Sequence, residues 1–222
     1  RLGVAQKGRL TLALKAHGRA AHTSHPENGV NAVYKMMEVV QRLRAMPLGH
    51  DPLVGSGILE LTEMISEPLP GTAFVPHGCS ARMVGRTIPG DTAQTMFARI
   101  DHALSGLEGV EVALDHMTQP CYTGVLLETD DFIPGWKNNP DNPYQERILK
   151  ALAHAGLPAD PFGVPAGTNA SASAGMFGIP SFIYGPATLA QAHIVDEWVS
   201  VDELFTAALG FQTIALACLG SE

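Results

Sequence analysis

The hydrophobic period changes several times along the first half of the chain, and the order of these changes restricts the fold more than any other feature. Apolar and polar residues alternate over residues 9–16, which is the two-residue period of a half-buried strand. Residues 30–43 carry apolar side chains three and four positions apart, as one face of a helix does. The same patterns predict strands at 58–65, 79–84 and 110–114 and a helix over 92–104.

This succession of strand, helix, strand, strand, helix and strand predicts a ferredoxin-like unit, in which a four-stranded antiparallel sheet carries two helices on one face. Side chains suited to capping stand before both helices. Asn28 or Asn31 can cap the first helix, and Asp91 or Thr92 can cap the second. Gly106 follows the second helix and is expected to end it.

The second half of the chain has a different texture. Residues 116–142 are rich in Pro, Gly, Asn and Asp and are expected to form strands and loops. A helix is predicted over 143–155, with Asn142 as its cap and Gly156 as its stop. Helices that alternate with buried strands indicate part of an α/β layer.

A long loop between a predicted strand and a predicted helix is the most unusual part of this layer. Residues 179–184 are a short apolar run, which predicts a central strand buried in a parallel sheet. Ser200 and Glu203 have the spacing of a capping box, which predicts a helix from there to about residue 219. The connection between them has roughly fifteen residues, more than such connections usually have, which favours a functional role. His193 is its polar centre.

Composition places the chain among ordinary globular proteins. Of its 222 residues, 45% are hydrophobic and 16% are charged, which is enough for a sizeable core. The length suggests one large domain or two small ones, and the change of texture near residue 115 favours a division into an α+β unit over 7–115 and part of an α/β domain over 116–222. The first residue is Arg1 rather than Met, and a strand-like run follows almost at once, so we expect that polypeptide upstream is missing.

Charge and cysteine content limit the partners and the compartment. The net charge of −8 predicts no attraction to nucleic acid or to an anionic membrane. We found no run of about eighteen apolar residues, so no membrane partner is expected either. The three cysteines form no Cys-x-x-Cys motif, which favours a reducing, cytoplasmic location.

Two polar stretches are candidates for chemistry, and each also has a structural interpretation. His193, followed by Asp196 and Glu197, can be a metal ligand or a solvated loop residue. The stretch from His22 to Asn31 lies between the first strand and the first helix, where loops often carry function. Its polar residues can equally cap the helix while its two histidines remain solvated.

Together the two stretches carry a family resemblance. Residues 18–32, Gly-Arg-Ala-Ala-His-Thr-Ser-His-Pro-Glu-Asn-Gly-Val-Asn-Ala, form one motif. The other runs from Gly178-Ile179-Pro180 through Gly185-Pro186 to His193 and Asp196-Glu197. They resemble the two C-terminal signatures of the co-catalytic zinc hydrolases, which include aminoacylase, acetylornithine deacetylase, succinyl-diaminopimelate desuccinylase and carboxypeptidase G. The resemblance covers nearly the whole chain.

The resemblance implies a fold and a set of site residues. The fold is an α/β zinc-hydrolase catalytic domain with a ferredoxin-like lid inserted in it, of which this chain would hold the lid and the C-terminal part. His193 matches a ligand of a site for two zinc ions, with cobalt or manganese as alternatives. His22 matches a lid histidine that reaches the partner subunit's active site and stabilises the tetrahedral intermediate. Arg86 matches an arginine that holds a substrate carboxylate, and Gly167 and Thr168 match a substrate-facing loop.

For two of these assignments a plainer interpretation stays open. Arg86 can be a solvated arginine at a strand end, and Gly167 and Thr168 can form a simple turn before a helix. The lid also departs from the family pattern, because Ala73-Phe74-Val75-Pro76 has no asparagine where many members have one.

The remaining metal ligands and the general base of this family come from an N-terminal half that is not in this sequence. We therefore expect the chain to be the C-terminal fragment of a zinc-dependent peptidase or N-acyl amino acid deacylase, which forms a homodimer through its lid and is inactive by itself. The small substrate would carry an amide bond and a carboxylate. The alternative is a non-catalytic dimerisation module with a supporting α/β remnant.

Other acidic residues and histidines are not expected to bind metal. Asp130 and Asp131 adjoin an irregular loop and are interpreted as solvated. His22 and His25 are three positions apart but have no third ligand nearby in the sequence, so no metal is expected in the lid.

Overall fold

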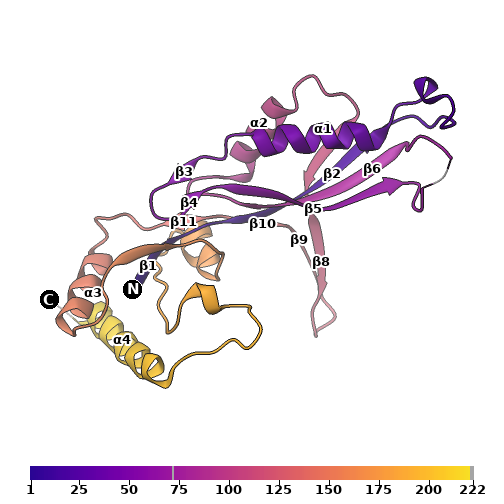
Figure 1. The fold of residues 1–222 in the computed structure, drawn as a ribbon. Coiled ribbons are helices and arrows are strands. Elements are labelled where there is room, and N and C mark those ends of the chain that lie inside the picture. Colours follow the sequence, from indigo (N-terminus) through magenta and orange to yellow (C-terminus); the bar gives the residue numbers. More distant parts are fainter. Residues whose placement is uncertain (72, 221–222) are drawn as a thin grey trace.

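In the computed structural model, which describes residues 1–71 and 73–220, two unequal layers meet at a narrow junction (Figure 1). The larger layer is an antiparallel sheet with the order β7-β2-β6-β5, where the short β10 (Phe132–Ile133) continues the β7 edge of β2. Its main strands and helices are β2 (Arg9–His17), α1 (Ala32–Ala45), β5 (Ile58–Glu67), β6 (Gly78–Arg86), α2 (Ala93–Ala103) and β7 (Val110–Leu114). The predicted order of strands and helices is thus present, with the connectivity of a ferredoxin-like sheet.

Both helices cover the same face of this sheet (Figure 1). The even-numbered side chains of β2, Leu10 to Ala16, are fully buried under them, as the two-residue alternation predicted. Met36, Leu43 and Ile100 supply the helix side of the core. The opposite face of the sheet carries charged side chains.

The helix starts follow the predicted capping chemistry. Asn31 caps α1, because its side chain accepts hydrogen bonds from the N–H groups of Val33 and Tyr34. Thr92 caps α2 in a reciprocal capping box with Thr95. In the second layer, Asn142 caps α3 (Pro143–His154), and Ser200 with Glu203 forms the predicted capping box of α4 (Val201–Leu219).

The smaller layer is a three-stranded sheet with the order β11-β1-β12. Strand β1 (Leu2–Gln6) runs parallel to β12 (Pro161–Val164) and antiparallel to β11 (Trp136–Lys137). Helices α3 and α4 pack against each other, and the core that they form with β1 includes Leu2, Val4, Ile148 and Leu152. The small-residue segment before residue 179 is a π-helical segment, η2 (Ser171–Met176).

The predicted central strand over 179–184 is wrong. The segment makes a single antiparallel bridge, between Ile183 and Gly3 of β1, and no regular ladder within the described chain. Pro180 has no N–H to donate, and the Ser181 carbonyl accepts from the Asn138 side chain instead of from a strand. The expected burial is absent as well, since none of the six residues is buried and Ile179 is 56% exposed.

Two segments of the chain pass from one layer to the other side by side, and each has a glycine where they meet. A Cβ on Gly8 would lie 2.4 Å from the Ile133 carbonyl and 2.5 Å from the Gly135 nitrogen. A Cβ on Gly135 would lie 2.8 Å from the Gly8 nitrogen. The segments β1 to β2 and β10 to β11 therefore pass in backbone contact, and this pair of crossings forms the hinge between the layers. The domain limits 7–115 and 116–222 stay a prediction.

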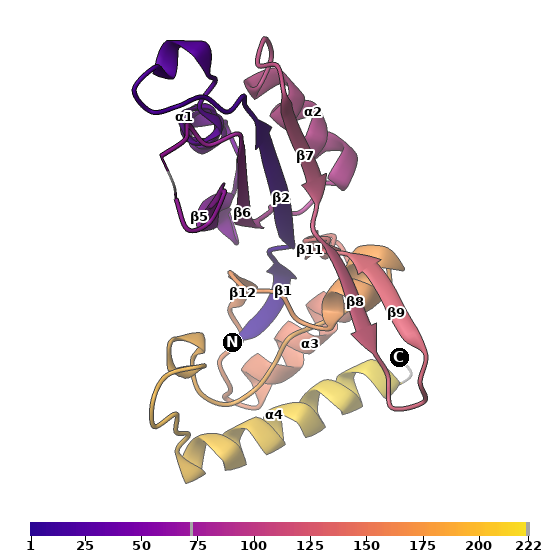
Figure 2. The same cartoon turned by 90° about the vertical axis from the view of Figure 1, so that its right-hand side faces the viewer.

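Two hairpins project from this framework. The short pair β3 (His50–Asp51) and β4 (Gly55–Ser56) lies near the hinge, where Asp51 pairs with Lys137 of β11 over 2.6 Å. The longer pair β8 (His116–Pro120) and β9 (Leu126–Asp130) extends away from the helix-covered face (Figures 1 and 2). All ten residues of its strands are exposed.

Helix α4 leaves much of its apolar surface uncovered. Phe205 and Leu216 are 73% and 66% exposed, and only Ala207 and Gly210 are buried. By length and composition α4 is apolar enough to cross a membrane, although Asp202 and Glu203 interrupt its first turn. The same composition occurs in helices covered by a second layer of protein.

Candidate functional site

A fully buried glutamine organises the loop that contains Gly167 and Thr168. The side-chain oxygen of Gln6, at the end of β1, accepts hydrogen bonds from the Thr168 N–H over 3.2 Å and from its hydroxyl over 2.6 Å. The side-chain nitrogen of Gln6 donates to the Ser171 hydroxyl over 2.5 Å. The Thr168 hydroxyl also accepts from the Ala170 N–H over 3.1 Å. The Gln6 side chain therefore holds the predicted substrate loop in place, while Gly167 and Thr168 remain exposed.

Two cationic side chains, Lys7 and Arg86, lie near each other at the hinge. Lys7 is buried, and its ammonium donates to the Ser56 carbonyl over 2.5 Å. Burial lowers the pKa of Lys7, and the nearby Arg86 guanidinium lowers it further. Arg86 is the half-buried last residue of β6, and none of the ion pairs of the described chain involves it. This region suits an anionic group such as a carboxylate.

The loop of His193 is held by backbone geometry and by its own carboxylates. His193 and Asp196 have φ values of 65° and 59°, the left-handed conformation that non-glycine residues seldom adopt. The His193 N–H donates to the Glu197 carboxylate over 2.9 Å, which anchors the turn. Strain of this kind persists where surrounding contacts hold it, and it is common at functional sites. The imidazole itself is exposed.

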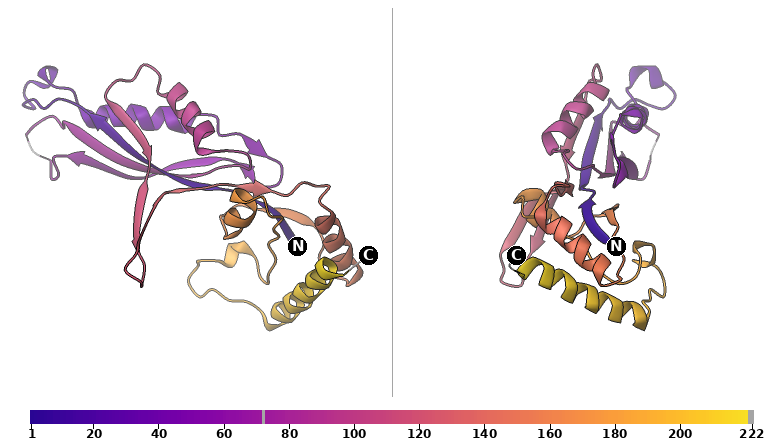
Figure 3. Two further views of the ribbon diagram at one scale, coloured as in Figure 1. Left: turned by 180° about the vertical axis from the view of Figure 1, so that it is seen from behind. Right: turned by 90° about the vertical axis from the view of Figure 1, so that its left-hand side faces the viewer.

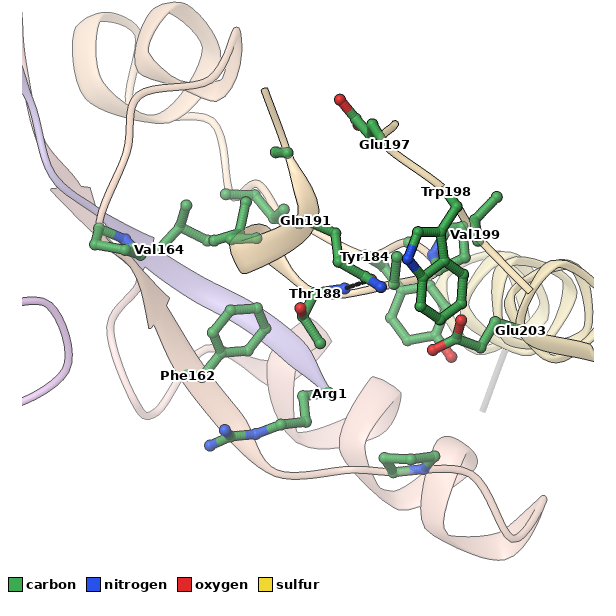
Figure 4. A pocket seen from close by; sticks show the side chains of 18 of the residues that line it. Arg1, Phe162, Val164, Tyr184, Thr188, Gln191, Glu197, Trp198, Val199 and Glu203 are labelled. Carbon is green, nitrogen blue, oxygen red and sulfur yellow. Dashed lines mark hydrogen bonds between the residues drawn. The ribbon is translucent and has the colours of Figure 1, made fainter. Parts of the chain in front are cut away.

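A cavity of about 1150 Å³ lies beside this loop. In Figure 4, Phe162 of β12 lies on one side of it and Trp198 on the other, with Thr188 between them. Its lining includes Ala192 and Glu197 but not His193. Most of the surface that lines the cavity is apolar, and Trp198 is 60% exposed.

The residues present do not fit a site for two metal ions. Across residues 1–71 and 73–220, no group of three or more His, Cys, Asp or Glu side chains is close enough to hold a metal. A dinuclear zinc site needs several anionic ligands, and His193 offers one neutral nitrogen. The chain by itself can contribute at most one corner of such a site.

His22 belongs to the loop between β2 and α1. This loop lies at the end of the lid that is remote from the second layer (Figures 1 and 3). Its imidazole is exposed, and Nδ1 contacts the Ser24 hydroxyl at 2.7 Å. Within one chain, Arg86 and Thr168 both lie near the hinge, because Thr87 accepts from the Gly8 N–H and Thr168 donates to Gln6. The loop between β2 and α1 and the loop before α4 stay apart (Figure 1).

One acidic residue proved to be structural rather than solvated. Asp131 is 6% exposed, and its carboxylate accepts hydrogen bonds from Arg9 and from the Thr11 hydroxyl, each over 2.5 Å. The interpretation of Asp131 as solvated is wrong because β10 pairs with β2 and carries this residue onto the sheet. Asp130 is exposed, and its partner is His116.

These features define the class of the protein. A ferredoxin-like lid is joined to part of an α/β layer by two chain segments that cross at the hinge, and the cationic side chains at the hinge suit an anionic group. Residues 4–109 match the peptidase dimerisation domain of the M20 family. The lid is thus an M20 dimerisation domain.

Relatives agree with this assignment. A protein of Escherichia coli strain K12, named uncharacterized protein YgeY, is 29% identical over 98% of this chain and 55% of its own length. The aminopeptidase PepT of Bacillus cereus superposes with a TM-score of 0.73 at 18% identity, over 99% of this chain and 54% of that chain. An M20 family metallo-carboxypeptidase of Sulfolobus solfataricus gives 0.63 at 11% identity, over 96% and 59%. The chain spans about half the length of these proteins and has about half of the M20 peptidase fold.

Sequence patterns did not single out Gln6 and Lys7, which lie at these sites in the structure. A signal existed for both, since polar residues end the apolar run 2–5 immediately before Gly8. Ser24 belongs to the polar stretch for which helix capping was the structural alternative, and its side chain contacts His22 instead.

Proposed function

We propose that this chain supplies the lid and the C-terminal part of the catalytic domain of a metal-dependent amidohydrolase or peptidase. The substrate class is N-acyl amino acids or short peptides, and the metal is zinc, with cobalt or manganese as alternatives. In this proposal His193 is one metal ligand and His22 donates to the partner subunit's reacting carbonyl. Arg86 binds a substrate carboxylate, and Gly167 and Thr168 face the substrate.

The observation that carries the proposal is the exposed apolar surface near the His193 loop. The cavity lining includes Trp198 and, from the first turn of α4, Glu203, and farther along α4 Phe205 and Leu209 are 73% and 48% exposed. Exposed apolar patches of this kind in a globular domain mark a surface that another protein layer covers. The simplest candidate for that covering layer is the other half of a protein that is as long as the relatives. That half would also bring the missing metal ligands beside His193.

Charge at the hinge supports a carboxylate-bearing substrate. Arg86 has no carboxylate partner among the described ion pairs, and its neighbour Lys7 is buried with a lowered pKa. A guanidinium held in such a place can bind a carboxylate through two parallel hydrogen bonds. The backbone of the loop held by Gln6 could contact the other end of a small substrate.

The lid offers a surface for a homodimer. Among the strands of residues 1–71 and 73–220, β5 pairs with β6 alone, and no other described strand pairs with its second edge. Helix α1 packs over these two strands and exposes Tyr34 and Met37 at 71% and 48%. A free strand edge beside exposed apolar side chains is suited to pairing with a second copy. A dimer is also required for His22 to reach an active site, because its loop is remote from the His193 loop of the same chain.

The experiment begins with the coding sequence upstream of Arg1. We expect it to encode a His-x-Asp pair and a Glu-Glu pair in frame. Coexpression of that upstream polypeptide with this chain should give a complex that hydrolyses N-acetyl amino acids when zinc is supplied. The 222-residue chain with zinc should be inactive and should sediment as a dimer. Hydrolysis by the chain alone, or no such pairs upstream, would overturn the proposal.

A further inference from the structure

A backbone N–H that donates to a histidine ring reveals which ring nitrogen lacks a proton, because an N–H group cannot accept a hydrogen bond. The N–H of Ser24 donates to Nδ1 of His22 over 3.2 Å. The Ser24 hydroxyl lies 2.7 Å from the same nitrogen. Nδ1 of His22 is therefore an acceptor, and the neutral ring carries its proton on Nε2.

We infer that Ser24 is a positioning residue that holds His22 as the Nε2–H tautomer. Nε2 lies on the side of the ring away from Ser24, and the ring is exposed, so the donor is presented outward. The Phe74 ring fixes the orientation further, since it meets the imidazole edge to face with centroids 6.2 Å apart and an angle of 77°. Backbone contacts also anchor the loop, because Thr23 donates to the Ala73 carbonyl over 3.0 Å.

Two other exposed histidines, His116 and His25, are arranged in the opposite way. Nδ1 of His116 lies 3.0 Å from the Asp130 carboxylate, and an ionised carboxylate can only accept. His116 therefore carries a proton on Nδ1, and this hydrogen bond raises its pKa. His25 makes the same kind of contact with Glu27 over 3.3 Å. Nε2 of His17 lies 2.9 Å from the Glu111 carboxylate and so carries the proton there. The exposed histidines therefore do not share one tautomer, and each tautomer follows from the contacts of its own ring.

The consequence for catalysis rests on the function proposed above. A neutral imidazole with Nε2–H can donate to an oxygen that becomes negative in the transition state. The other tautomer would direct a lone pair at the same oxygen and repel it. By removing that tautomer, Ser24 would keep every His22 side chain in the donating form without requiring a charged ring.

The test is a long-range ¹H–¹⁵N correlation spectrum of the full chain labelled at histidine. It is recorded at about pH 8.5, above the ordinary imidazole pKa of about 6.5. The signals of His22 are assigned with His22→Gln. We expect an unprotonated Nδ1 and a protonated Nε2 for His22, and a protonated Nδ1 for His116. A protonated Nδ1 in His22 would overturn the inference.

Three variants isolate the cause. Ser24→Pro removes the N–H and the hydroxyl, so the His22 signals should move toward a mixture of tautomers. Ser24→Ala keeps the N–H and should keep Nε2–H, and Thr23→Ala should leave the spectrum unchanged. A Ser24→Pro spectrum identical to that of the wild type would refute the role of Ser24. If Ser24→Pro disturbs the loop, the wild-type spectrum still decides whether His22 is the Nε2–H tautomer, by its contrast with His116. None of these readouts depends on metal or hydrolysis, so failure here is distinct from failure of the proposed function.

Discussion

Gln6 and Thr168 are 162 positions apart in the sequence and yet share two hydrogen bonds, because the side-chain oxygen of Gln6 accepts both the N–H and the hydroxyl of Thr168. Gln6 is the last residue of β1 and lies two positions before the hinge glycine Gly8. The loop proposed to face the substrate is therefore attached to the strand that leads into the lid. A change in the angle of the lid would act on this loop through one side chain.

Gln6→Ala should destabilise the chain and loosen this loop. The substitution removes the partner of Thr168 and leaves the buried Ser171 hydroxyl without its donor, which costs about 1–3 kcal/mol. Urea unfolding measures the loss, and hydrogen exchange at the amides of Thr168 and Ala170 should accelerate. Gln119→Ala, on the exposed hairpin, is the matched control and should change neither quantity. Unchanged exchange at Thr168 would show that the loop is held by other contacts.

Gly8→Ala should be among the most damaging single-methyl additions. The new Cβ would meet backbone atoms of Ile133 and Gly135 at 2.4 and 2.5 Å, and neither can move without opening the hinge. Overpacking of this kind costs about 1–3 kcal/mol. Gly185→Ala is the control, since no atom lies within 4 Å of its added Cβ. Equal unfolding midpoints for the two variants would contradict the close crossing.

The pair Asp51 and Lys137 should make the link between the layers depend on pH. Burial raises the pKa of Asp51, but the hydrogen bond from Lys137 and those from the N–H groups of Leu53 and Val54 outweigh it, so the pKa is lowered overall. A lowered carboxyl pKa contributes stability that is present above the unfolded value of about 3.9 and is lost as the pH falls through the folded value.

Asp51→Asn should therefore lower the free energy of unfolding by about 1 kcal/mol at neutral pH, a figure reduced for the partly exposed ammonium. The difference from the wild type should shrink as the pH falls below about 4. Urea unfolding at several pH values measures it. Glu146→Gln, in an exposed pair with Lys150, should show no measurable change. A loss that is the same at all pH values would exclude the ion pair as its cause.

Gly210 shows how packing outweighs helix propensity in α4. Alanine at this position would gain about 1 kcal/mol in intrinsic helix propensity. Its Cβ, however, would lie 2.2 Å from the Tyr184 hydroxyl and 2.4 Å from its ring, which also packs edge to face on Phe211. We expect Gly210→Ala to be destabilising by about 1–3 kcal/mol, as for other overpacked sites. In a Tyr184→Ala background the same change should be neutral or stabilising. A double-mutant cycle measures the coupling energy between the two positions, and a value of zero would contradict the close contact.

The success and failure of the sequence patterns have a physical basis. Local signals were sufficient for β2, α1 and α4, because side-chain period and caps such as Asn31 and Ser200 act within a few residues. The prediction for residues 179–184 failed in burial as well as in pairing, since none of the six residues is buried and the segment makes a single bridge, from Ile183 to Gly3. Gln6 and Asp131 could not be predicted, since their partners become neighbours only when distant strands meet. The roles of His22, Arg86, Gly167, Thr168 and His193 stay predictions that depend on the resemblance.

The central claim is that His193 is one ligand of a metal site completed by polypeptide outside this chain. The most direct test is the number of zinc ions bound per complex, measured by mass spectrometry of metals after coexpression with the upstream half. Wild type and His154→Ala, which alters an exposed histidine of α3, should bind two ions. His193→Ala should bind fewer while keeping the same assembly. Equal zinc content in the wild type and His193→Ala would contradict the account.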